Sequence, residues 1–417
     1  MSTILPSVQL EDFIFTFAHA IDLVGLDDAW HGRRVGLLAA ELALAAGADW
    51  PARQRAYRLG LLHDCGVSST VQHRAIAMEL EWQGAEAHCI RGEALLARCA
   101  PLADLAPVVR HHHTRWETLQ TLDLPDTVRT EAALVFLADR IDTLSRASYA
   151  DRSTLAISNM LRDQLLALSG TLFSPYWIGV FAEASRCESF WLMLDSECVL
   201  DYQNEMRAQA GNEIMSWADF KQGAYLLADV IDAKSPFTAE HSLGVARVSR
   251  YLAALGGLDD ERCEMVEVAG LLHDIGKLQI PDDILDSPCG LNEHDAGVMR
   301  AHSFATYMVL KRLRGIDDMA RWAAWHHETL DGRGYPFHLQ DAQMPPEARI
   351  IHVADMYQAL AQNRPYRNAM SPDAILRLLR ARADRHLLDS GLFEQIERHL
   401  GAVDLAAVGV RKTALVA

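Results

Sequence analysis

Apolar residues recur along most of the chain at the three- and four-residue spacing of amphipathic helices. This spacing predicts helices that include the segments 35–46, 130–144, 224–231, 245–255 and 374–381. The alternation of apolar and polar residues that is typical of strands is scarce, and glycine and proline cluster in short breaks between the helical segments. The pattern therefore predicts an all-α fold.

Similar segments occur twice, in the same order. RLGLLHDCG at 58–66 matches VAGLLHDIG at 268–276, and VFLADRIDTL at 135–144 matches IHVADMYQAL at 351–360. Unrelated segments would not share both their amino-acid sequence and their order, so the chain is predicted to be a tandem duplication of one helical module.

The intervals between histidines repeat as well. Two intervals are equal in the two copies: His31 to His63 equals His241 to His273, and His88 to His112 equals His302 to His326. With the seam near 200–215, we predict an N-terminal domain at 1–205 and a C-terminal domain at 215–417.

The composition is that of an ordinary globular protein, but the net charge is −17. This charge argues against partners such as a nucleic-acid polymer or an anionic membrane surface. An anionic small molecule would have to be held by local cations, either metal ions or a few Arg and Lys residues in one pocket.

Other sequence features favour a cytoplasmic protein. The seven cysteines are scattered without a CxxC pair, which favours free thiols over disulfides or a zinc knuckle. The N-terminus lacks the basic and apolar regions of a secretory signal. The longest apolar run, at 37–46, contains Glu41 and is too short to span a bilayer.

The second copy contains a set of residues that can bind metal ions. A lone histidine is more often a hydrogen-bonded or surface residue than a ligand. Here several lie in order within helices rich in Leu, Ala and Val, where burying them without a cation would be costly. Imidazole and carboxylate together suit a site for two divalent ions. The candidate ligands are His241, His273, Asp274, His302, His326, His327 and Asp355.

Three motifs in this copy resemble a known family. HDIGK at 273–277, HHETLDGRGYP at 326–336 and RPYR at 364–367 are similar to the HD-GYP subfamily of the HD superfamily of metal-dependent phosphohydrolases. The resemblance covers most of residues 220–400. It implies an all-α domain with two or three ions, usually iron or manganese. It also implies hydrolysis of cyclic di-GMP to linear pGpG, sometimes onward to GMP.

The resemblance implies a role for each ligand. Asp274 would bridge two ions, one held by His241, His273 and Asp355 and the other by His302, His326 and His327. Such a pair of ions would lower the pKa of a shared water and neutralise the phosphate oxygens. Asp274 and Lys277 are therefore the candidate catalytic residues, with Lys277 as a donor to the scissile phosphate.

Substrate-binding residues are predicted around the same site. Arg364 and Arg367 would clamp the second phosphate or a guanine edge, because guanidinium groups suit both. Two roles stay open for the turn of Gly334, Tyr335 and Pro336: it lines the pocket rim, or it binds a protein partner.

The sequence departs from the family pattern at two positions. Some members hold a third ion with a Glu four residues before the first His, where this chain has Phe237. Two divalent ions, iron or manganese, are therefore expected. Many members have an Asp three residues after the last metal-binding Asp, where this chain has Gln358. A neutral amide would change the hydrogen bonds around the ligands.

The first copy keeps a full set of ligands for a second metal site, namely His31, His63, Asp64, His88, His112, His113 and Asp139. His111 is interpreted as their neighbour in sequence only. Val67 stands in the place of Lys277, no Gly-Tyr-Pro follows the histidines, and SRASY at 145–149 replaces RPYR. Three hypotheses follow: a metal-loaded regulatory or dimerising domain, a second hydrolase, or a structural relic. The retained ligands favour bound metal, and the lost cations disfavour the same reaction.

The sequence thus predicts two tandem all-α HD-type domains, of which the second hydrolyses cyclic di-GMP and the first supports or regulates it. Three alternatives remain. One is a preference for cyclic GMP-AMP, and another is a non-catalytic cyclic-dinucleotide receptor that signals through the Gly-Tyr-Pro loop. The third, a mononucleotide phosphohydrolase, leaves Gly334–Pro336 unexplained. A homodimer is compatible with the sequence.

Overall fold

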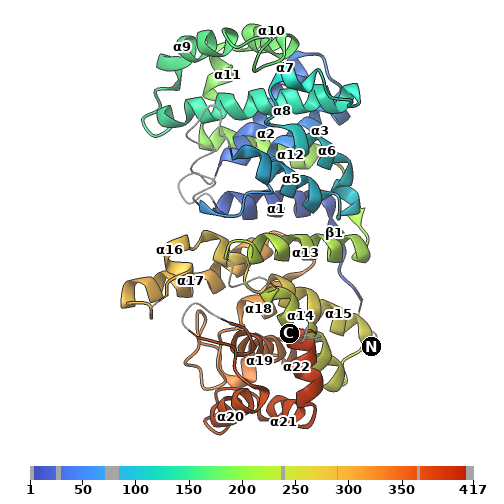
Figure 1. The fold of residues 1–417 in the computed structure, drawn as a ribbon, viewed down its shortest axis with the longest axis vertical. Helices are drawn as coiled ribbons and strands as arrows, with labels where there is room; N and C mark the ends of the chain where they lie inside the picture. The colour runs from blue at the N-terminus through green and yellow to red at the C-terminus, as the bar shows by residue number, and fades with distance from the viewer. Residues whose placement is uncertain are drawn as a thin grey trace, which may run out of the picture. The chain divides into compact units, whose positions relative to one another are not determined.

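The computed structural model describes residues 4–24, 30–70, 84–235, 240–288, 290–363 and 367–409. The chain forms two compact units. We call Gln9–Ile214 the N-terminal unit, and Met215–Ala417 together with Met1–Val8 the C-terminal unit. In Figure 1 the first runs from blue to green and the second from yellow-green to red.

The N-terminal unit is built from helices. These are α1 (Leu10–Val24), α2 (His31–Ala45), α3 (Trp50–Leu62), α5 (Ala85–Leu96), η1 (Ala100–Leu105), α6 (Ala106–His111), α7 (Trp116–Leu119), α8 (Asp126–Ser145), η2 (Arg146–Ser148), α9 (Thr154–Leu166), α10 (Pro175–Ala184), α11 (Glu188–Leu192) and α12 (Ser196–Gln209).

The C-terminal unit is helical as well. It contains α13 (Trp217–Asp232), α14 (His241–Leu255), α15 (Asp260–Leu272), η3 (Ile275–Gln279), α16 (Asp282–Leu285), α17 (Glu293–Leu310), α18 (Asp317–Ala324), η4 (Asp341–Gln343), α19 (Pro346–Ala361), α20 (Pro372–Ala383), α21 (Ser390–Arg398) and α22 (Leu400–Val408).

In the described part of the chain two short strands, β1 (Val8–Gln9) and β2 (Ile214–Met215), are hydrogen-bonded to each other, and isolated bridges join Ser169 to Phe173 and Asp331 to Gln340. The predicted all-α fold is confirmed. No helix among the described residues is both long and apolar enough to cross a bilayer.

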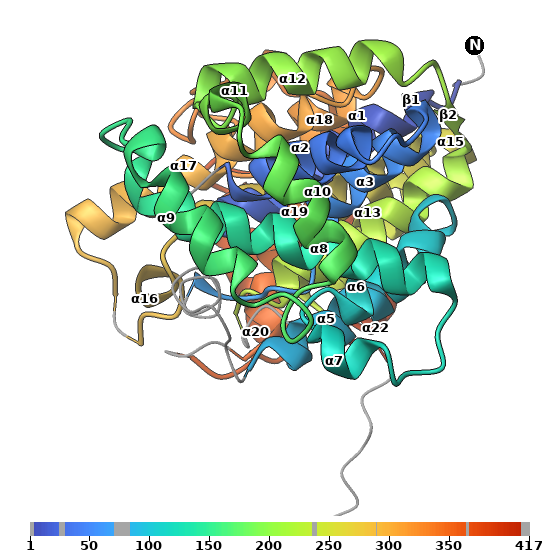
Figure 2. The same ribbon diagram turned by 90° about the horizontal axis from the view of Figure 1, so that it is seen from above.

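Each unit contains its own equivalent pair of packed helices. In the N-terminal unit α2 packs on α3 and α8, and in the C-terminal unit α14 packs on α15 and α19. Small residues let these helices approach closely: a Cβ atom on Gly60 would lie 2.5 Å from the Cα atom of Gly36. The long helix α8 also contacts α6 and α10, as both views show (Figures 1 and 2).

The same capping residue begins the second helix of each pair. Asp49 accepts a hydrogen bond from the backbone of Ala52 at the start of α3, and Asp259 accepts one from Arg262 at the start of α15. A capping carboxylate satisfies an otherwise unpaired N–H group at the helix start. Both helices end directly before a His-Asp pair. The two units therefore place this pair at the same position, after a helix that begins with the same cap.

Candidate metal centres

The structure brings the seven predicted ligands of the C-terminal unit together. They lie on separate elements: His241 begins α14, His273 and Asp274 follow α15, His302 lies on α17, His326 and His327 follow α18, and Asp355 lies on α19. Two groups of three each offer one ligand atom per residue, and within a group these atoms lie within 4.8 Å of one another: His241, His273 and Asp355, and His302, His326 and His327.

Asp274 lies between these two groups. Its Oδ2 atom is 3.5 Å from Nε2 of His241 and 3.2 Å from Nε2 of His273. Its Oδ1 atom is 3.5 Å from Nε2 of His302 and 3.7 Å from Nε2 of His326. One oxygen therefore faces each group, which is the geometry that a bridging carboxylate requires.

The backbone fixes the tautomers of three of these histidines. The Nδ1 atoms of His273, His302 and His326 lie 2.8, 2.6 and 2.6 Å from backbone carbonyl oxygens, to which they must donate. When the rings are neutral, their Nε2 atoms carry lone pairs that point into the site, as metal-binding histidines require.

The polar atoms inside the site fit a cation. The Nε2 atoms of His302 and His326 are 3.2 Å apart, and two lone pairs would face each other there. The buried Nε2 of His273 and Oδ1 of Asp274 have no hydrogen-bond partner among the described residues. Buried polar atoms without partners are costly, and a divalent ion between them would remove the cost.

Electrostatics differ between the ligands of this site. Burial lowers the pKa of His302 to about 4 and that of His327 to about 3, so both imidazoles are neutral near pH 7. Burial also opposes protonation of His273, but the carboxylates of Asp274 and Asp355 outweigh it and raise the pKa of His273 to about 10. Burial opposes ionisation of Asp274 and Asp355, but neighbouring histidines hold the pKa of each carboxyl well below its usual range. A divalent ion would displace the proton of His273 and leave neutral imidazoles with ionised carboxylates, a donor set that suits transition metals.

Lys277 faces this centre. It lies on η3, and its Nζ atom is 2.6 Å from Oδ2 of Asp274. The tight turn of η3 therefore brings the ammonium group beside the carboxylate between the two groups of ligands.

The Gly-Tyr-Pro loop packs against one ligand. The ring of Tyr335 lies 4.8 Å from that of His327, and the guanidinium carbon of Arg300 lies 5.8 Å from the Tyr335 ring. A Cβ atom on Gly334 would lie 2.4 Å from the Cα atom of Glu328, so only glycine fits at this position.

Glu328 is a residue to which the sequence analysis gave no role. It is fully buried and accepts hydrogen bonds from the backbone N–H groups of Phe337 and Leu339, at 2.7 and 2.9 Å. It thereby ties the loop after Pro336 to the His326-His327 turn. A charged residue directly after two candidate ligands was the signal that could have revealed it.

Of the two arginines predicted to clamp a phosphate, Arg364 lies outside the described residues. The guanidinium of Arg367 donates hydrogen bonds to the carbonyl oxygens of Ala359 and Leu360 at the end of α19, at 2.7 and 3.0 Å, and to that of Asn368. Its Nη atoms therefore satisfy a helix end, whereas the sequence pattern predicted a contact to substrate.

The first of the two departures from the family pattern, Phe237, lies outside the described residues. The second, Gln358, is buried and packs on α14, where a Cβ atom on Gly244 would lie 2.2 Å from its side chain. The missing Cβ of Gly244 thus makes room for the amide.

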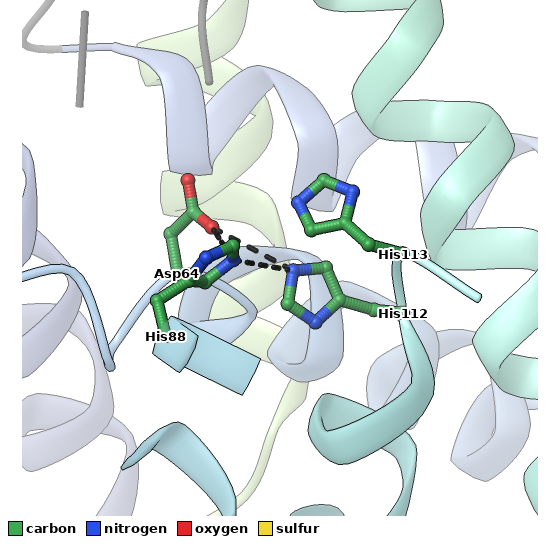
Figure 3. Close-up of side chains that lie close together, drawn as sticks. All are labelled: Asp64, His88, His112 and His113. Atoms are coloured by element: carbon green, nitrogen blue, oxygen red, sulfur yellow. Dashed lines mark hydrogen bonds and ion pairs between the residues drawn. The ribbon is translucent and has the colours of Figure 1, made fainter. Parts of the chain in front are cut away.

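The N-terminal unit contains a second cluster, drawn in Figure 3. The side chains of Asp64, His88, His112 and His113 point toward one another, and one ligand atom from each lies within 4.8 Å of the others. Oδ1 of Asp64 is 3.2 Å from Nε2 of His88, which is 3.3 Å from Nε2 of His112. His111 lies outside this group of donors.

The remaining predicted ligands of this unit lie on the other side of Asp64. Its Oδ2 atom is 3.7 Å from Nε2 of His31 and 3.5 Å from Nε2 of His63. Asp139 is 3.5 Å from Nε2 of His31, but it also accepts hydrogen bonds from the buried Arg140. This arginine was not recognised in the sequence, because a helical position after a carboxylate usually faces elsewhere.

Comparisons with known proteins agree with this geometry. The HD domain family matches residues 225–392, and a second HD domain match covers residues 29–144. Each match contains one of the two clusters.

The chain is similar over most of its length to an enzyme of Vibrio cholerae, "3'3'-cGAMP-specific phosphodiesterase 1". The two are 35% identical over 405 residues, which cover 94% of this chain and 92% of the relative. "Cyclic di-GMP phosphodiesterase response regulator RpfG" of Xanthomonas campestris is 38% identical over 161 residues, covering 38% of this chain and 43% of the relative.

A solved structure shares the fold. The crystal structure of the cyclic GMP-AMP specific phosphodiesterase V-cGAP3 of V. cholerae matches with a TM-score of 0.62 at 22% sequence identity. The match covers 95% of this chain and 98% of that structure, and therefore includes both units.

Proposed function

Because this chain belongs to the HD-domain family of cyclic-dinucleotide phosphodiesterases, we propose that its C-terminal unit hydrolyses 3'3'-cGAMP in preference to cyclic di-GMP. The sequence motifs favoured cyclic di-GMP, with cyclic GMP-AMP as the alternative. We now favour 3'3'-cGAMP because the chain is 35% identical to the 3'3'-cGAMP-specific enzyme over 94% of its length. The similarity to the cyclic di-GMP enzyme RpfG, by contrast, covers 38% of the chain.

The donor set supports a dinuclear centre in this unit. Each group of three ligands offers imidazole nitrogens, and Asp274 presents one oxygen to each group. Two divalent ions bound there would supply an activated water and neutralise charge on the phosphate. Iron or manganese remains our proposal for the metal, since imidazole and carboxylate ligands suit both.

The protein's own groups would orient the substrate around that centre. Lys277 is beside Asp274 and offers a positive charge for a phosphate oxygen. The ring of Tyr335, which packs on His327, offers an aromatic surface at the edge of the site, near Arg300. Gly334 and Pro336 flank that residue, and the missing Cβ of Gly334 lets the loop approach Glu328. Arg364 is our candidate for the second phosphate or a base edge.

A receptor without catalysis is the competing function from another class. In a receptor, bound metal would only stabilise the fold. The position of Lys277 beside Asp274 would then have no explanation. A mononucleotide phosphohydrolase would not need the aromatic and arginine groups that follow the histidine pair.

The test is a comparison of kcat/KM on 3'3'-cGAMP, cyclic di-GMP and a nucleoside monophosphate, with full-length protein reloaded with manganese. We expect a linear dinucleotide as product and at least a tenfold preference for 3'3'-cGAMP, about 1.4 kcal/mol in transition-state binding. Equal or better hydrolysis of cyclic di-GMP would overturn the preference. Binding of a cyclic dinucleotide without any turnover would support the receptor.

A further inference from the structure

We propose that the N-terminal unit binds a single divalent metal ion through four side chains, Asp64, His88, His112 and His113 (Figure 3). Charged groups of the protein itself take the place of a second ion. The two units thus hold different numbers of ions, although their ligand sequences match position by position. This inference does not depend on the substrate or the activity of the C-terminal unit.

The geometry on one side of Asp64 favours an ion. Nδ1 of His112 donates to the carbonyl oxygen of Val109 at 2.6 Å, so Nε2 is the atom left to bind an ion, and it lies 3.3 Å from Nε2 of His88. The buried Nε2 of His113 has no hydrogen-bond partner among the described residues. A metal ion between these nitrogens would satisfy them together.

The other side of Asp64 differs from its counterpart in the C-terminal unit. There Asp355 faces His241 and His273, at 3.3 and 3.7 Å, and the next residue is Met356. The three offer a complete set of donors for an ion.

In the N-terminal unit the matching carboxylate, Asp139, is already paired. Its Oδ2 atom accepts hydrogen bonds from Nη2 and Nε of Arg140, at 2.7 and 3.1 Å, and both side chains are almost completely buried. Arg140 stands at the position of Met356. The carboxylate that would complete a second metal position is therefore neutralised by a guanidinium group.

A second ion pair lies behind His31. Nδ1 of His31 is 2.7 Å from Oδ2 of Asp142, and Oδ1 of Asp142 accepts from Nε of Arg34. In the C-terminal unit the two positions of Arg34 and Asp142 hold the neutral residues Gly244 and Gln358.

The arginine in place of Met356 changes the charge that a second ion would meet. The buried guanidinium of Arg140 lies beside Asp139 and would repel a divalent cation in a medium that screens poorly, whereas the opposite charges of Arg34 and Asp142 offset each other. His31, His63 and Asp64 still lie within reach of one another, but without Asp139 they share their one carboxylate with the ion on the other side.

The experiment measures the number of manganese ions bound per chain. Full-length wild-type protein and the Asp64→Ala variant are stripped with a chelator, reloaded with Mn(II), desalted and analysed for manganese per chain. Asp64 faces both halves of its cluster, so its loss should empty every metal position in the N-terminal unit. We expect the variant to hold one ion fewer than wild type. A difference of two, or no difference, would overturn the proposal.

Further variants exclude misfolding and test the cause. His113→Ala should also lose one ion while keeping the helical circular dichroism of wild type. Arg140→Met should gain one ion at high Mn(II), and failure to gain it would refute the role given to Arg140. Asp274→Ala should remove the C-terminal ions only. If the C-terminal unit bound none, the difference caused by Asp64→Ala would still be one.

Discussion

A Cβ atom on Gly276 would lie 2.0 Å from the backbone carbonyl oxygen of His302. The glycine therefore lets the turn after His273 and Asp274 pack directly on α17, which carries His302. Thr306 strengthens this contact, since its hydroxyl accepts from the N–H of Gly276 and donates to the carbonyl of His273. The N-terminal unit repeats the contact with Gly66 and His88, at 1.9 Å.

Gly276→Ala should separate α17 from the His-Asp turn and move His302 away from Asp274. We expect loss of metal from the C-terminal unit, a fall in kcat/KM of about 100-fold or more, and destabilisation of about 1–3 kcal/mol from overpacking. Metal analysis and kinetics check this. The matched control is Gly66→Ala, which strains the other unit and should leave the C-terminal ions bound. Full metal content and rate in Gly276→Ala would show that this contact does not position His302.

Asp274→Ala should abolish turnover, because it removes the one carboxylate that both groups of ligands share. We expect a loss of about 10³-fold or more together with the C-terminal ions, since bound metal supplies several kcal/mol of transition-state stabilisation. Asp274→Asn keeps the shape and removes the charge, so it separates packing from ligation. Wild-type metal content and rate in Asp274→Ala would show that the active site lies elsewhere.

Lys277→Met should lower kcat/KM by about 100-fold, the usual cost of one lost electrostatic donor in an active site. The metal content should stay at the wild-type level, because the ammonium group is a partner of Asp274 and not a ligand. Lys311→Met, at an exposed position directly after α17, is the control for removing one positive charge. Loss of metal in Lys277→Met would mean that the lysine maintains Asp274 and does not act on the phosphate.

Tyr335→Ala should raise KM for 3'3'-cGAMP about tenfold, because an aromatic contact contributes about 0.5–1.5 kcal/mol beyond its buried area. Tyr335→Phe keeps the ring against His327 and should stay close to wild type. Steady-state kinetics on the two variants distinguish the ring from the hydroxyl. An equal defect in both would assign the effect to the hydroxyl.

Arg367→Ala should destabilise the C-terminal unit by about 1–3 kcal/mol, because carbonyl oxygens at the end of α19 lose their donor. Thermal unfolding measures this, and Arg364→Ala is the matched variant in the same motif. The clamp predicted from the sequence would instead raise KM in both variants. An unchanged melting temperature with a raised KM in Arg367→Ala would favour the clamp over the helix-capping role.

The sequence by itself determined the helical class and the duplication, and it named the candidate ligands that the structure brings together. Helical periodicity indicates which face of a segment is buried, and equal intervals between histidines in similar sequence segments indicate a repeated module. The periodicity lies within one segment, and the repeat is found by comparing two segments. Neither pattern therefore requires knowledge of the tertiary structure. The identity of residues such as His241 and Asp355 could therefore be predicted, together with the two HD domains.

Only the tertiary structure decided how side chains from different helices meet. It assigned one oxygen of Asp274 to each group of histidines, the backbone N–H groups of the loop to Glu328, and the guanidinium of Arg140 to Asp139. Arg140 and Met356 occupy matching positions, and helical periodicity does not tell which partner either side chain meets. The physical reason is that a buried charge acts through its nearest partners, and these are fixed by the packing of distant segments rather than by neighbours in sequence.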